Sequence, residues 1–144
     1  MKLKIEKIVT AYQIFDDISL KGVSPEDIAK IARARMAMRP HYEAYIAFDN
    51  DVREANKPFD EDWKFVVTLE QKGLEKASKD DIDRHQKILK PFIEAINIAL
   101  NPEREKEVDL EFEPISVETE AFIMSVTGFS FEQMRTYLGF ILTC

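Results

Sequence analysis

Two short segments that lie far apart in this 144-residue chain alternate strictly between apolar and charged residues. Residues 1–5 read Met-Lys-Leu-Lys-Ile, and residues 107–113 read Glu-Val-Asp-Leu-Glu-Phe-Glu. A period of two is typical of a half-buried β-strand, because successive side chains point to opposite faces. Since opposite charges favour cross-strand pairing, we predict that the two segments form an antiparallel pair with lysines beside acids. This pairing constrains the fold strongly, because it brings residues 1–5 next to residues 107–113.

The segments between and after these strands have the apolar spacing of amphipathic helices. An isolated two-stranded ribbon is only marginally stable, so these helices must cover its apolar face. Cap signals at Ser24, Ser78, Ser116 and Ser130, together with the stop at Gly128, delimit several of them. We predict helices over about 6–20, 25–55, 60–74, 78–101, 116–127 and 130–142. Pro40 and Pro91 fall inside two of these helices and predict a kink or a break.

These patterns predict a mainly α fold with a small two-stranded antiparallel β element (α+β), built as a bundle of five to six helices. Proline and glycine total only 10 residues, and no convincing linker interrupts the sequence. We therefore interpret residues 1–144 as a single helical domain. The one cysteine, Cys144, cannot form an internal disulfide, and we expect it to be an unimportant terminal thiol.

Membrane and export segments are not predicted. Glu6, Lys7, Asp16 and Asp17 interrupt any apolar core that a secretory signal would require. The longest uncharged stretch, residues 121–131, has 11 residues, whereas a bilayer span needs roughly 20. We expect a protein of the cell interior with no membrane partner.

Charge is unevenly distributed along the chain. The formal net charge is −7, and residues 103–120 alone hold eight acids against two bases. On an exposed strand these acids either prevent edge-to-edge aggregation or offer a negative surface to a basic partner. An opposite island of four bases without an acid occupies residues 30–39: Lys30, Arg33, Arg35 and Arg39. The island either pairs with acids of this same protein or lies against phosphates of a nucleic acid.

No catalytic motif is recognisable in the sequence. The two histidines, His41 and His85, lie in separate predicted helices without the spacing typical of a zinc site. His85 stands in an apolar seam, so we interpret it as a packed histidine bonded to a nearby polar group. Glycine-rich phosphate loops and nucleophile elbows are missing from the sequence as well. We therefore expect a non-enzymatic protein with no metal or cofactor.

Several segments resemble a small family of phage and prophage proteins of unknown function from phages of Gram-positive bacteria. The resemblance lies in MKLKIEKIVTAY, AKIARARMAMRPHYEAYIAF, EVDLEFEPIS and TYLGFIL, which together cover roughly half of the chain. None of these is a catalytic motif. The resemblance implies a phage-encoded accessory or virion-associated protein that acts through contacts, located in the host cytoplasm or on the virion, and it implies no functional residue.

Two functional hypotheses follow. The first is an interaction protein whose last helix closes the core with one apolar face and meets a partner or a second copy with another, through Tyr137, Leu138, Phe140, Ile141 and Leu142. On this hypothesis the protein is a homo-oligomer. The alternative is a nucleic-acid-binding regulator that uses the basic island, Lys30, Arg33, Arg35 and Arg39.

Overall fold

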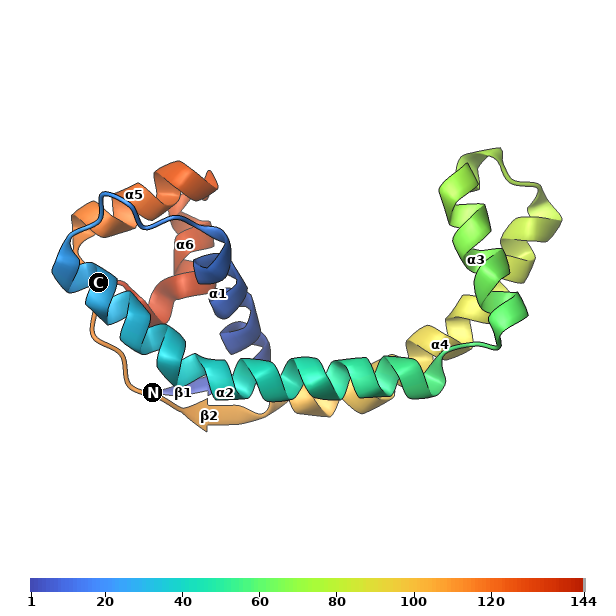
Figure 1. Cartoon of the computed structure of the whole chain (residues 1–144), viewed down its shortest axis with the longest axis horizontal. Helices are drawn as coiled ribbons and strands as arrows, with labels where there is room; N and C mark the ends of the chain where they lie inside the picture. Colours follow the sequence, from blue (N-terminus) through green and yellow to red (C-terminus); the bar gives the residue numbers. More distant parts are fainter. Residues whose placement is uncertain (144) are drawn as a thin grey trace. The chain divides into compact units, whose positions relative to one another are not determined.

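The computed structural model describes residues 1–143, and these form six α-helices, two short 3₁₀ turns and one two-stranded sheet (Figure 1). The elements in chain order are β1 (Lys2–Lys4), α1 (Ile5–Asp17), α2 (Pro25–Asn56), α3 (Asp60–Lys72), η1 (Leu74–Lys76), α4 (Lys79–Glu105), β2 (Glu107–Asp109), α5 (Val117–Thr127), α6 (Phe131–Leu138) and η2 (Gly139–Ile141). The predicted fold class, mainly α with a small two-stranded antiparallel element, is confirmed. The prediction for Cys144 lies outside the described residues.

The described residues divide into two compact units. We call residues 1–46 and 104–143 the terminal unit, and Ala47–Glu103 the central unit. The interpretation of residues 1–144 as a single domain stays a prediction. Both boundaries fall inside continuous helices, one in α2 and one in α4, so no linker composition marks them in the sequence.

The predicted strand pair is confirmed, although it is shorter than the alternating segments. β1 pairs antiparallel with β2, and Leu3 stands opposite Val108. Lys2 faces Asp109 across the ladder, but the Lys4 ammonium pairs with Glu105 at 2.7 Å and not with an acid of β2. These charges are exposed, so burial of Leu3, which is 7% exposed, contributes more to the pairing than they do.

Leu110, which the alternation predicted to be a buried strand residue, is half-buried and follows the end of β2. Leu3→Ala should therefore lower the free energy of unfolding by about 2 to 5 kcal/mol, and Leu110→Ala by clearly less, because it removes less buried surface. Urea unfolding of the two variants checks this order. A larger loss for Leu110→Ala would show that the burial of the two side chains is the reverse of that described.

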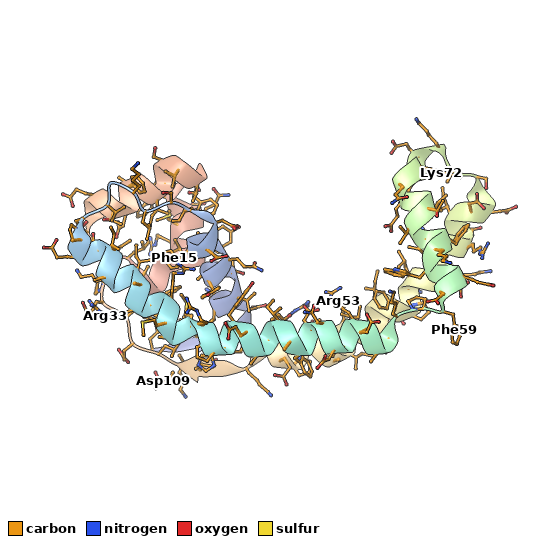
Figure 2. The ribbon with its side chains drawn as sticks, in the orientation of Figure 1. Phe15, Arg33, Arg53, Phe59, Lys72 and Asp109 are labelled. Atoms are coloured by element: carbon orange, nitrogen blue, oxygen red, sulfur yellow. The ribbon has the colours of Figure 1, made fainter. Side chains whose placement is uncertain are left out.

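The core of the terminal unit is built mainly from helix faces. Residues at three-to-four spacing on α1 are buried against residues of α2, α5 and α6, and Phe15 lies inside this unit (Figure 2). The fully buried large side chains here are Ile8, Phe15, Ile31, Met38, Ile115, Ile123, Met134, Leu138 and Ile141. α1 ends at Asp17, before the predicted end at Leu20, and Phe15 is its last buried residue.

The predicted caps are confirmed at five helix ends. The hydroxyls of Ser24 and Ser78 accept hydrogen bonds from the amides of Asp27 and Asp81, at 3.3 and 3.2 Å. The Ser116 hydroxyl accepts a hydrogen bond from the Thr119 amide, and Ser130 with Gln133 forms a reciprocal capping box. Gly128 ends α5 at φ 75°, a left-handed conformation that glycine adopts without strain.

The prolines do not end the helices that contain them. Pro40 lies inside the uninterrupted helix α2, and Pro91 and Pro102 lie inside α4. The alternative of a break at Pro40 is wrong, as is the predicted end of the fourth long helix at Asn101-Pro102, because α4 continues to Glu105. Each proline removes one backbone hydrogen bond. At Pro40, burial of Met38 before it and of Tyr45 after it offsets that loss.

Candidate protein interface

The basic island is occupied by contacts within the terminal unit. The Lys30 ammonium donates to the Pro114 carbonyl at 3.0 Å, and Arg33 pairs with Glu113 at 3.1 Å. Arg35 pairs with Asp16 at 2.7 Å and stacks over the Tyr12 ring. The fourth base, Arg39, donates to the Tyr12 hydroxyl at 3.0 Å. These contacts match the interpretation in which the island pairs with groups of the same protein.

The C-terminal apolar set does not form an exposed face. Leu138 and Ile141 are fully buried, Leu142 is buried, and Tyr137 and Phe140 are half-buried. Helix α6 ends at Leu138, and the 3₁₀ turn η2 then redirects Phe140 toward Phe112, with ring centroids 4.8 Å apart. Leu138, Ile141 and Leu142 therefore close the core of the terminal unit, a role that the hypothesis assigned to one apolar face, and a partner contact through Tyr137 and Phe140 stays a prediction.

His85 lies in the central unit, as a packed histidine bonded to a polar group. Its ring is 7% exposed, and Nε2 lies 3.0 Å from a carboxylate oxygen of Glu70. His41, which the sequence left without a partner, lies half-buried on α2 in the terminal unit, far along the chain from His85. Within residues 1–143, no group of three or more histidine, cysteine or acidic residues is placed to hold a metal ion.

A buried carboxylate that the sequence did not single out ties two helix starts together. Asp27, in the first turn of α2, accepts hydrogen bonds from the Ser116 amide at 3.1 Å and from the hydroxyls of Ser116 and Thr119. Burial raises the pKa of Asp27, but these hydrogen bonds and the nearby Lys30 outweigh it and lower the pKa to about 2. From the sequence, Asp27 appeared only as an acid suited to a helix N-terminus. Asp27 therefore links the N-terminal ends of α2 and α5 through these hydrogen bonds.

The central unit buries few of its apolar side chains. Among the described residues it contains four buried apolar side chains, against sixteen in the terminal unit. It also leaves several large ones exposed, including Phe59 at 88%, Ile98 at 78% and Ile93 at 49%. Figure 2 shows Phe59 in the connection between α2 and α3. The central unit thus leaves more large apolar side chains exposed than it buries. Such exposure is typical of a surface that binds another molecule.

One groove on the central unit combines apolar and basic residues. We call it the basic groove; it has a volume of about 580 Å³ and is lined by Asn56, Lys57, Pro58, Phe59, Asp62, Arg84, Lys87, Ile88, Pro91, Phe92 and Ala95. Three bases and one acid line it, although the whole chain carries a net charge of −7. The Arg84 guanidinium is 3.9 Å from Asp62 and lies over the Phe65 ring, which holds it at the groove.

A second groove, of about 590 Å³, uses another face of α4. We call it the histidine groove; it is lined by Leu74, Ile82, His85, Gln86, Leu89, Lys90, Ile93 and Glu94. Four of these eight side chains are apolar, and the two formal charges have opposite sign. The sequence predicted the apolar seam of α4 as core-facing, but part of that seam lines this open groove.

No protein-family model matches the chain, and no curated protein or solved structure shows significant similarity to it. Across residues 1–143, no helix combines the length and apolar character that crossing a membrane requires.

Proposed function

We propose that the protein is a non-enzymatic interaction protein of phage or prophage origin, which acts through protein–protein contacts in virion assembly or in the infected cell. The observation that carries the proposal is the sparse core of the central unit, beside which Phe59, Ile93 and Ile98 stay exposed. Phe59 and Ile93 each line a groove that also holds charged side chains, and concave surfaces of this composition are typical of binding sites. The resemblance to phage and prophage proteins supports the cellular setting.

The nucleic-acid alternative receives no comparable support. It requires Lys30, Arg33, Arg35 and Arg39 to reach phosphates, and each of them already contacts an acceptor of the terminal unit. We therefore propose that the protein partner binds the central unit and not the basic island.

Capture of partners from the native cell tests the proposed function. A tagged full-length protein should retain a specific protein partner, and the triple variant Phe59→Ser/Ile93→Ser/Ile98→Ser should retain at least about tenfold less, because these side chains supply the apolar contact. Quantitative mass spectrometry of the captured proteins gives the ratio.

The matched control changes three exposed apolar residues of the terminal unit: Met36→Ser/Val126→Ser/Phe131→Ser. This control should retain the partner at the level of the unchanged protein, and circular dichroism should show all three proteins folded. Equal loss of the partner in both triple variants, or no specific partner for the unchanged protein, would contradict the proposal.

A further inference from the structure

The basic groove has an electrostatic complement elsewhere on the same chain. Its bases come from two elements: Lys57 from the connection after α2, and Arg84 and Lys87 from neighbouring turns of α4. In a protein of net charge −7, such a locally basic surface attracts acidic segments while most of the remaining surface repels them. The exposed Phe59 also lines this groove, beside the bases.

The terminal unit carries such a segment. We call Glu107, Asp109, Glu111 and Glu113 the acidic row; all four are exposed, and Glu111 is 91% exposed. Alternate residues of an extended chain lie about 7 Å apart, a spacing that long lysine and arginine side chains can match. Leu110 and Phe112, which alternate with these acids, are half-buried, and the Phe112 ring lies against that of Phe140.

The acidic row already makes weak contacts, which leave it able to bind further cations. The amino group of Met1 lies 2.8 Å from Asp109 and 2.9 Å from Glu111, and Arg33 lies 3.1 Å from Glu113. These pairs are exposed and therefore screened by salt. A carboxylate has two oxygens and about four acceptor positions, so a second base can approach without displacing the first.

We propose that the basic groove binds the acidic row of a second copy of this chain, so that copies associate head to tail. The inference rests on the proposed function, because it names one partner of the central unit. The two contacting surfaces differ, so the contact is heterologous, and repetition of it generates a ring or an open chain of copies. Opposite charges carry the recognition.

Two charge-reversal variants and their mixture test the proposal. The groove variant is Lys57→Glu/Lys87→Glu, which leaves Arg84 on Asp62 and Phe65. The row variant is Glu111→Lys/Glu113→Lys, which lies outside the β1–β2 ladder. The control, Lys72→Glu/Lys76→Glu, makes the same change of net charge as the groove variant at residues outside the groove. Sedimentation velocity of each full-length protein over a range of concentrations measures association.

The unchanged protein and the control should associate at low salt and dissociate as salt rises. Each reversal variant alone should associate at least about tenfold more weakly, because like charges then face each other. An equimolar mixture of the two variants should recover association, since the acidic groove of one meets the basic row of the other. Recovery in the mixture excludes misfolding of either variant as the cause.

A protein that stays monomeric at every concentration would overturn the head-to-tail contact while leaving partner capture, and hence the proposed function, unaffected. Association that survives both reversals would also overturn it. Association that survives both reversals but is lost in Ile93→Ser would assign self-association to the histidine groove instead.

Discussion

Phe15→Ala should lower the free energy of unfolding by about 3 to 5 kcal/mol, the largest effect that we expect from one apolar substitution. Phe15 is only 1% exposed, in the core to which α1, α2, α5 and α6 contribute. Alanine leaves a cavity that the surrounding side chains can fill only in part, so both burial and packing contacts are lost. Urea denaturation followed by circular dichroism measures the change.

Phe59→Ala is the matched control for the same chemical change. Phe59 is 88% exposed, so the substitution should alter the free energy of unfolding by less than about 0.5 kcal/mol. A similar loss of stability in both variants would contradict the described burial. The pair therefore tests the core of the terminal unit and the openness of the basic groove in one experiment.

Asp27→Asn should lower the free energy of unfolding by about 2 to 4 kcal/mol. The substitution removes a charged acceptor from the Ser116 amide and from the Ser116 and Thr119 hydroxyls, and it turns an amide group toward these donors. Glu26→Gln is the control, because Glu26 is exposed on the same helical turn. Thermal and urea unfolding compare the two variants, and equal losses would show that only the helix dipole is involved.

The contribution of Asp27 should also depend on pH. Its pKa in the folded protein is about 2, below the ordinary value of 3.8 for an aspartate, so the folded state binds the proton more weakly than the unfolded state. The stabilisation is fully present above about pH 4 and is lost as the pH falls through about 2; its size is on the order of 2 kcal/mol. The stability difference between the unchanged protein and Asp27→Asn should therefore shrink between pH 5 and pH 2. A constant difference would exclude the ionised carboxylate as its source.

Local patterns predicted the secondary structure well where the relevant interactions are short in sequence. The Ser116 cap, the Ser130 capping box and the Gly128 stop each involve residues within four positions, so the chain itself specifies them. The β1–β2 pairing is a long-range contact, but it could be predicted because both segments alternate apolar and charged residues and their charges have opposite sign. At Pro40 the sequence left a kink or a break open, and α2 continues without a break. The continuation of α4 past Pro102 was missed, because a proline disfavours a helix interior without excluding it.

The candidate sites could be predicted only in part. The sequence showed the basic island, but Glu113, Asp16 and Tyr12, with which it pairs, come from segments up to 80 positions away. The apolar C-terminal set was recognised correctly as apolar, yet a sequence cannot show whether an apolar side chain meets the core or a partner. The basic groove was missed entirely, since its bases are scattered along residues 57–87 among acids.

The sequence by itself determined the helices, their caps, the strand pair and the fold class, because each depends on periodicity or on chemistry between near neighbours. Only the tertiary structure decided that Asp27 locks α2 to α5, that residues 138–142 close the core, and that the central unit leaves Phe59 exposed beside three bases. Burial and hydrogen-bond partners depend on which distant segments meet in three dimensions. Asp27 and Thr119, for example, lie 92 positions apart in the sequence, and Met1 and Glu111 lie 110 positions apart.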